Sequence, residues 1–218
     1  MDNRGCFITL EGGEGVGKTT QLRKLADRLR LETNREIIPT RSPGGTVIAE
    51  SIRDILKQRN REEDLLPESE LLLFGVCHSQ MSEKLIRPAL ARGAILLSDR
   101  FTDSTLVYQG YARGLSADFV RQINSFSCRG LKPDLTILLD LDPETGFRRT
   151  GLRAGNAENM QEDRFDSESM EFHQKVRNGF LAIAAMEAER FVIIDASGSI
   201  EEVHQHIWEA VRAKLGLL

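Results

Sequence analysis

Short runs of apolar residues alternate along the chain with longer segments in which apolar positions recur every three or four residues. Strands buried in a parallel sheet are typically continuous apolar runs, whereas the longer spacing is typical of a helix with one buried face. Five apolar runs predict five strands, at residues 6–11, 35–41, 94–99, 135–140 and 191–195. Because helical segments separate them, we predict an α/β fold: a three-layer arrangement with a five-stranded, mostly parallel sheet and helices on both faces.

Several helix starts are visible between the predicted strands. Pro67 suits the first turn of a long helix that continues to about residue 92, because proline is well tolerated at that position. Asp142 and Ser199 are predicted N-caps, and Glu202 follows Ser199 at the spacing of a capping box. These signals support the alternation of strands and helices.

Composition and charge narrow the class of protein. The 218 residues suit a single domain, 1–218, and the net charge of −4 argues against a general nucleic-acid binder. No apolar run approaches the roughly 20 residues that cross a bilayer, so we expect no membrane-spanning segment. The three cysteines are far apart and lack metal-ligand spacing, which favours small buried residues in a reducing cytoplasm.

A glycine-rich loop follows the first predicted strand and opens a helix. Residues 12–19 fit G-x-x-x-x-G-K-[ST], in which backbone N–H groups surround phosphate oxygens at a helix N-terminus. Lys18 is expected to reach the β- and γ-phosphates, and the Thr19 hydroxyl to join a Mg²⁺ shell. We therefore predict MgATP or another Mg²⁺–nucleoside triphosphate as ligand. The predicted ATP-binding residues are Gly12, Gly13, Glu14, Gly15, Val16, Gly17, Lys18, Thr19 and Thr20.

This loop contains a carboxylate, Glu14, although it is built to hold an anion. A carboxylate that faced the triphosphate would repel it, so we expect Glu14 to point away from the loop's phosphate site. A ribose hydroxyl of a second nucleotide is a fitting partner, because an ionised carboxylate accepts hydrogen bonds. The alternative is a solvated side chain, and the loop alone does not decide between them.

Three further features separate phosphoryl transfer from other P-loop activities. The N/T-K-x-D motif that reads guanine in GTPases does not occur in the sequence. The third strand ends at Asp99-Arg100, and Arg149, Arg153 and Arg164 cluster around the polar segment that follows the fourth strand. Transfer between two charged phosphate chains requires more cations than hydrolysis does. The number of arginines in these two segments therefore favours transfer of a phosphoryl group to a second phosphate.

Five motifs in order along the chain resemble the bacterial thymidylate kinase family. They are GGEGVGKTT, TRSPGGT, DRFTDSTLVYQG, PDLTILLDLDPETG and EDRFD, and together they span most of the chain. The resemblance implies an ATP- and Mg²⁺-dependent transferase that converts dTMP to dTDP in dTTP synthesis. It also implies a cytoplasmic homodimer, to which the apolar helices at 47–56 and 67–92 are suited.

The resemblance also implies roles for individual residues. Glu14 would accept from the 3′-hydroxyl of dTMP, Phe74 would stack on thymine, and Asp99 would lie near Mg²⁺ with Thr19. For Phe74 alone, an ordinary core position is the competing interpretation. The implied dTMP-binding residues are Glu14, Arg41, Phe74, His78, Arg100, Ser104, Thr105, Tyr108 and Gln109.

Residues 149–165 correspond to the family's lid. The family divides by whether its transition-state arginine lies in the P-loop or in the lid, and this P-loop has none. The resemblance therefore implies the lid-arginine type. The implied catalytic residues are Lys18, Arg100, Arg149 and Arg153. Each lid arginine taken singly could instead be a solvated surface charge.

Two positions depart from the family pattern. Ser42 replaces a glutamate, and His78 replaces an arginine that reads a thymine carbonyl. Imidazole is shorter and only partly charged near pH 7, so thymine recognition is expected to be looser or differently arranged, unless His78 simply packs between helices. A monophosphate kinase for dUMP or dGMP stays open as an alternative, as does a P-loop ATPase that switches a partner protein.

Overall fold

The computed structural model describes residues 4–58, 63–151, 165 and 168–217. Five strands form one sheet in the order β2-β3-β1-β4-β5, and all four of its strand pairs are parallel. The strands are β1 (Cys6–Glu11), β2 (Ile37–Arg41), β3 (Ile95–Asp99), β4 (Leu135–Asp140) and β5 (Phe191–Asp195). The predicted α/β class and five-stranded sheet are confirmed, with β2 and β3 beginning slightly later than expected.

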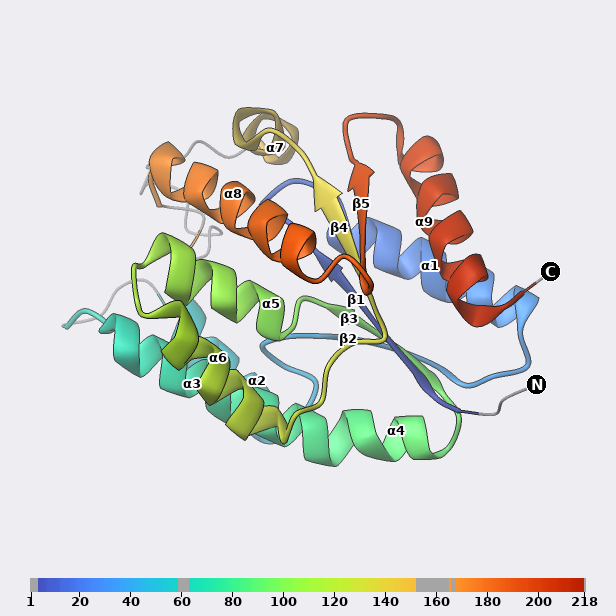
Figure 1. Cartoon of the computed structure of the whole chain (residues 1–218), viewed down its shortest axis with the longest axis horizontal. Coiled ribbons are helices and arrows are strands. Elements are labelled where there is room, and N and C mark those ends of the chain that lie inside the picture. The colour runs from blue at the N-terminus through green and yellow to red at the C-terminus, as the bar shows by residue number, and fades with distance from the viewer. Residues whose placement is uncertain (1–3, 59–62, 152–164, 166–167, 218) are drawn as a thin grey trace.

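Helices cover both faces of this sheet (Figure 1). On one face lie α1 (Lys18–Glu32) and α9 (Ile200–Leu215). The opposite side carries α2 (Val47–Lys57), α3 (Pro67–Met81), α4 (Arg87–Ala91), α5 (Thr102–Thr105), α6 (Ala117–Cys128) and α8 (Met170–Met186). Successive residues of β1 face different layers: Ile8 packs in the cluster with α1 and α9, whereas Phe7 packs in the cluster with α3 and α4. The continuous apolar character of β1 therefore reflects burial on both sides.

The predicted caps are present. The Asp142 side chain accepts a hydrogen bond from the Thr145 backbone N–H at 3.1 Å and begins α7 (Pro143–Thr150). Ser199 and Glu202 form both bonds of a capping box at the start of α9. Each cap satisfies backbone N–H groups that have no partner inside the helix.

The long helix predicted from Pro67 is divided. Between α3 and α4 the residues Ser82–Ile86 adopt a π-helical turn, so the helical path continues but its side-chain phase changes. A second π-helical segment, Leu106–Ala112, follows α5. Such turns occur frequently at functional sites because they re-aim side chains on an otherwise regular helix. Here the second one carries two of the predicted site residues, Tyr108 and Gln109.

The parallel arrangement brings the carboxyl ends of all strands to one edge. Asp99 at the end of β3 lies in register with Leu10 of β1 and with Arg41 of β2. The glycine loop leaves the sheet directly after Glu11, at the same edge, where ligands bind in open α/β sheets. Within the described part of the chain, no helix combines the length and apolar character needed to cross a bilayer.

Candidate active site

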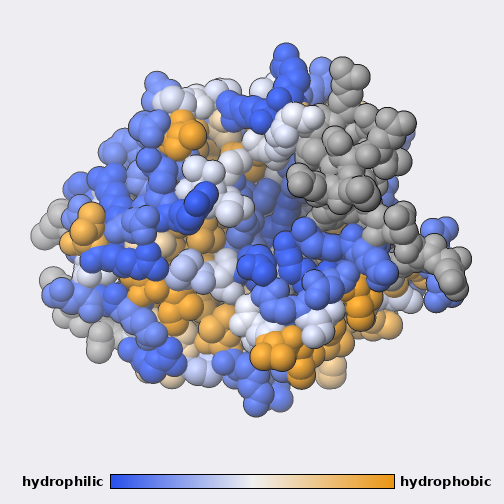
Figure 2. Space-filling view, turned by 180° about the vertical axis from the view of Figure 1, so that it is seen from behind, coloured by the Kyte–Doolittle hydropathy of each residue, from blue (hydrophilic) through white to orange (hydrophobic). Residues whose placement is uncertain are grey.

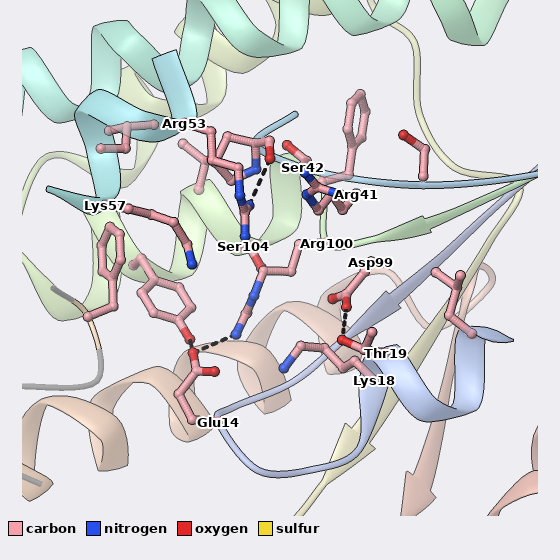
Figure 3. A pocket seen from close by; sticks show the side chains of 18 of the residues that line it. Glu14, Lys18, Thr19, Arg41, Ser42, Arg53, Lys57, Asp99, Arg100 and Ser104 are labelled. Carbon is pink, nitrogen blue, oxygen red and sulfur yellow. Dashed lines mark hydrogen bonds and ion pairs between the residues drawn. The ribbon is translucent and has the colours of Figure 1, made fainter. Parts of the chain in front are cut away.

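A cavity of about 870 Å³ opens at this edge (Figure 3). Its lining comes from the glycine loop, the ends of β2 and β3, helices α2, α3 and α7, and the second π-helical segment. The predicted site residues in the lining are Glu14, Gly15, Gly17, Lys18, Thr19, Thr20, Arg41, Phe74, Asp99, Arg100, Ser104, Thr105, Tyr108, Gln109 and Arg149. Most of the predicted donor and acceptor residues that the structure describes therefore line one cavity.

The glycine loop folds tightly around the Lys18 side chain. The Lys18 ammonium donates to the carbonyl oxygens of Gly12 at 3.2 Å and Gly13 at 2.6 Å, and its burial lowers the pKa of Lys18. Val16 is buried in the core beneath the loop, and neither Gly12, Gly13 nor Val16 belongs to the cavity lining. Gly12 and Gly13 contact Lys18 through their carbonyl oxygens, and Val16 anchors the loop in the core.

Gly15 and Gly146 bring two backbone segments into direct contact. A Cβ on Gly15 would overlap the backbone of Gly146, and a Cβ on Gly146 would overlap the Glu14 carbonyl oxygen. Gly15 also has φ = 70°, a left-handed conformation that glycine adopts without strain. The approach of α7 to the loop thus depends on two positions without side chains.

Thr19 and Asp99 place two oxygen ligands side by side. The Thr19 hydroxyl donates to an Asp99 carboxylate oxygen at 2.7 Å, next to the Lys18 side chain (Figure 3). Mg²⁺ is bound in nucleotide sites through few protein oxygens together with phosphates and water, so this donor set fits the ion. The structure brings the two predicted metal residues together.

The Glu14 carboxylate points toward the Arg100 guanidinium (Figure 3). One of its oxygens accepts from the Arg100 guanidinium at 2.6 Å and from the Tyr108 hydroxyl at 2.8 Å. Burial alone would raise the pKa of Glu14, but the charges of Arg100 and Lys18 and the Tyr108 hydrogen bond lower it to about 2. Glu14 is therefore ionised at neutral pH and offsets cationic charge inside the cavity.

Arg100 connects the loop to the opposite side of the cavity. Besides Glu14, its guanidinium donates to the Gly12 carbonyl oxygen at 3.0 Å and to the Ser104 hydroxyl at 3.1 Å. Burial opposes the charged form, but the nearby Glu14 carboxylate outweighs this effect and raises the pKa of Arg100. A permanent cation thus lies between the two ends of the cavity.

Further cations lie across the cavity on β2 and α2. Arg41 donates to the Glu50 carboxylate at 2.8 Å, and Arg53 donates to the Pro43 carbonyl oxygen at 2.8 Å. Sequence reasoning missed Arg53 and Lys57, which both line the cavity. Their four-residue spacing places them on one face of α2, and that spacing after the TRSPGGT motif is the signal that could have found them.

Ser42, one of the two departures from the family pattern, also lies in this part of the lining. It is 5% exposed, and its backbone N–H donates to the Asp99 carbonyl oxygen at 2.9 Å. The residue therefore ties the loop after β2 to the end of β3. A short side chain suffices for this backbone contact.

Three aromatic side chains of the cavity lining, Phe74, Tyr108 and Phe165, lie close together. The Phe165 ring centroid lies 6.3 Å from that of Phe74 and 5.8 Å from that of Tyr108. Phe74 is partly exposed and lines the cavity, so the interpretation as an ordinary core residue does not fit it. Phe165 lines the cavity too, although it was recognised only as part of the EDRFD motif.

Gln109 is held by a buried carboxylate. Its side-chain amide donates to Glu70 at 2.7 Å, and Arg113 donates to the same Glu70 oxygen at 3.3 Å. Glu70 and Gln109 are both fully buried. Sequence reasoning missed Glu70, because nothing in its local pattern shows that α3 and the second π-helical segment meet there.

The structure does not place His78 in the cavity lining. Its ring is fully buried, with its centroid 5.1 Å from that of Phe101, and burial lowers the pKa of His78 to about 3. The expectation that the ring is partly charged near pH 7 is therefore wrong, since a neutral imidazole is favoured throughout the physiological range. His78 packs between helices behind Phe74.

Arg149 lines the cavity near the end of α7, and its guanidinium donates to the carbonyl oxygens of Ala196 at 2.6 Å and Ser197 at 2.8 Å. Arg153, Arg164 and most of the predicted lid at 149–165 lie outside the described residues. The role of Arg149 as a lid cation stays a prediction.

The fold and the cavity together define a class of protein. A glycine loop with its lysine, a threonine–aspartate oxygen pair and a second compartment of arginines and aromatic rings are the parts of a P-loop nucleotide kinase. The profile of the thymidylate kinase family matches residues 10–207, and the chain therefore belongs to this family.

Individual relatives agree with the family match. The chain is 45% identical over 211 residues to the thymidylate kinase of Geotalea uraniireducens, covering 97% of this chain and 98% of the relative. It is 47% identical over 209 residues to a thymidylate kinase of Synechococcus sp. strain JA-3-3Ab, covering 96% of each. The crystal structure of thymidylate kinase from Ehrlichia chaffeensis is 31% identical, covers 95% of this chain and 99% of that chain, and superposes with a TM-score of 0.74.

Replacing Gly146 with alanine tests how closely the glycine loop depends on α7. Because the added Cβ would overlap the Glu14 carbonyl oxygen, the loop or α7 must shift. We expect Gly146→Ala to weaken MgATP binding by about tenfold or more in calorimetry, or ~1.4 kcal/mol. Gly110→Ala is the matched control, since its Cβ would meet the Leu106 side chain at an ordinary 3.5 Å. Equal affinity in both variants would contradict the constraint.

Proposed function

We propose that this protein transfers the γ-phosphoryl group of MgATP to dTMP, forming dTDP for dTTP synthesis. The observation that carries the proposal is the single cavity that holds a P-loop lysine at one end and arginines with aromatic rings at the other. The names of the curated relatives agree with this activity. We also propose a cytoplasmic location, supported by the three cysteines, which are buried and unpaired.

The glycine loop is proposed to hold the donor. Lys18 would contact the β- and γ-phosphates, exchanging the Gly12 and Gly13 carbonyls for phosphate oxygens. Thr19 and Asp99 would hold Mg²⁺, which supplies positive charge to the phosphate oxygens when bound. The backbone N–H groups at the start of α1 add a positive partial charge at the same point.

The acceptor is proposed to bind beyond Glu14. Arg41 and Arg100 would contact the phosphate of dTMP, and Arg53 and Lys57 add positive charge on the same side. Glu14 would accept from the 3′-hydroxyl with the oxygen that Arg100 and Tyr108 leave available.

The base of dTMP is proposed to lie among the aromatic rings. Phe74 would stack on thymine, with Phe165 near the same face of the cavity. The residues proposed to surround the base and sugar are Ser104, Thr105, Tyr108 and Gln109. The Tyr108 ring and the buried polar groups then restrict which bases fit, through shape and hydrogen bonds.

The transfer needs no general base from the protein. The second pKa of a phosphate monoester is about 6, so the dTMP phosphate is mostly dianionic at pH 7. One of its oxygens forms the bond to the γ-phosphorus as the bond to the β,γ-bridging oxygen breaks, and ADP leaves. Lys18, Arg100 and the proposed lid arginines Arg149 and Arg153 would stabilise the charge on the group in transit.

A homodimer is also proposed, formed through α2, α3 and α6. Figure 2 shows groups of apolar side chains along the lower part of the molecule, and those right of centre lie where α2 and α3 come after the half-turn from Figure 1. The exposed apolar residues on the three helices are Val47, Ile48, Ile55, Leu72, Val76, Phe119 and Phe126. These helices pack side by side, α2 against α3 and α3 against α6. Exposed apolar side chains on neighbouring helices support a protein–protein interface.

A panel of nucleoside monophosphates tests the activity. With MgATP and coupled detection of ADP, dTMP should be converted with the highest kcat/KM among dTMP, dUMP, dCMP and dGMP. A preference for dUMP or dGMP would assign the protein to a different monophosphate. ATP hydrolysis that is indifferent to every monophosphate would instead support a P-loop switch protein and contradict the proposal.

Replacing Lys18 tests the phosphate contact. Because the ammonium is proposed to stabilise charge on the phosphates, Lys18→Ala should lower kcat by about 10²-fold or more while the melting temperature changes little. Lys24→Ala is the matched control, since Lys24 lies on the same helix and pairs with Glu201 at the surface. Comparable rates in the two variants would remove Lys18 from the mechanism.

Sedimentation velocity tests the dimer. The protein should sediment with twice the chain mass of 24.5 kDa. Leu72→Asp should shift it toward the monomer, because a carboxylate would be buried at the interface without a partner. Leu31→Asp is the control on α1, where Leu31 is 88% exposed and away from the proposed interface. A monomer at micromolar concentration before any substitution would refute this part of the proposal.

A further inference from the structure

Glu11, the last residue of β1, is a buried carboxylate below the cavity and not part of its lining. One of its oxygens accepts from the Phe101 backbone N–H at 2.8 Å, and the other accepts from the Ser104 hydroxyl. Both donors follow Arg100 closely in the chain. Glu11 therefore holds the segment that begins at Arg100 through two hydrogen bonds, one to each carboxylate oxygen.

Arg100 itself has an uncommon backbone conformation. Its φ of 69° is left-handed, and for a residue with a side chain this costs on the order of 1 kcal/mol or more unless the surroundings hold it. Its N–H donates to the Leu10 carbonyl oxygen at 3.0 Å, and its carbonyl oxygen accepts from the Ser98 hydroxyl at 2.7 Å. The bond from Phe101 to Glu11 completes the turn on its far side.

This turn decides where the Arg100 guanidinium lies. In the observed conformation the guanidinium contacts the Gly12 carbonyl oxygen, the Ser104 hydroxyl and the Glu14 carboxylate. A return to the ordinary φ range would redirect the side chain relative to β3. Without the Glu11 acceptor, the Phe101 N–H would also be buried without that partner, which favours such a rearrangement.

We propose that Glu11 is a positioning residue that holds Arg100 in its left-handed turn and so sets the acceptor phosphate site. The inference rests on the proposed function, in which Arg100 binds the phosphate of dTMP. Glu11 touches neither substrate in this scheme. It acts through the Phe101 backbone and the Ser104 hydroxyl.

The hydrogen-bond pattern, more than the negative charge, is what this role requires. Glu11 lies near Asp103, whose carboxylate is held by Arg190 at 2.7 and 2.8 Å, and burial together with the Asp103 charge raises the pKa of Glu11. A protonated Glu11 could still accept from the Phe101 N–H and donate to Ser104, because a hydroxyl both donates and accepts. A glutamine offers the same combination.

Two substitutions separate positioning from a general contribution to stability. Glu11→Gln keeps both contacts and should leave KM for dTMP within about threefold of the unmodified protein. Leucine is similar in size to Glu11 but has no hydrogen-bond acceptor. Glu11→Leu should raise KM for dTMP by about tenfold or more. The rise in KM for MgATP should be clearly smaller, because Arg100 contacts the glycine loop only through Gly12 and Glu14. If Glu11→Leu does not fold, Glu11→Asp replaces it, since a side chain one carbon shorter cannot reach both donors and should raise the same constant.

The outcomes are distinct. A folded Glu11→Leu protein with unchanged KM for dTMP, or with both KM values raised equally, would overturn the positioning role. Glu11→Gln as impaired as Glu11→Leu would overturn it too, because charge and not hydrogen-bond geometry would then matter. Absence of dTMP phosphorylation in the unmodified protein would instead refute the proposed function, before any variant is compared.

Discussion

The ion pair between Glu14 and Arg100, at 2.6 Å, is the contact on which the arrangement of the site depends. It joins the glycine loop after β1 to the turn after β3, and Tyr108 adds a hydrogen bond to the same carboxylate oxygen. The pair is only partly exposed, so solvent screens its attraction weakly. The Arg100 guanidinium also donates to the Gly12 carbonyl oxygen of the loop. The loop can contain a carboxylate because that charge is matched across the cavity.

The hydrophobic pattern predicts the sheet well, since strands buried on both faces leave continuous apolar runs whose ends differ from the structure by at most two residues. The helix caps at Asp142 and Ser199 could also be predicted, because each depends on residues only three positions apart in the sequence. The π-helical turn at Ser82–Ile86 could not be predicted from the sequence. Its wider turn changes the direction in which the following side chains point, but it leaves no characteristic change in residue type. Strand order also lies beyond local patterns, as it depends on which pairs of strands meet in space.

For the site, residues inside a recognisable motif were predictable, and most of them line one cavity. Arg53, Lys57, Glu70 and Glu11 were missed because their importance arises from contacts between distant segments. Glu11 directly precedes the glycine loop, yet only the folded chain shows that its carboxylate is bonded to residues 101 and 104. His78 illustrates the opposite case, in which a motif position predicts a ligand contact that burial behind Phe74 does not support.

The uniform direction of the strands has a practical consequence. Every strand ends at the edge of the sheet that carries the cavity, so β1 starts at the opposite edge, where Leu217 packs against the cluster that contains Cys6. The start of β1 and the last turn of α9 consequently lie at the edge remote from the cavity, and they are also remote from helices α2, α3 and α6 (Figure 1). An affinity tag, a fluorophore or a surface-immobilisation handle attached at either terminus would leave the nucleotide entrance and the helical surface unobstructed.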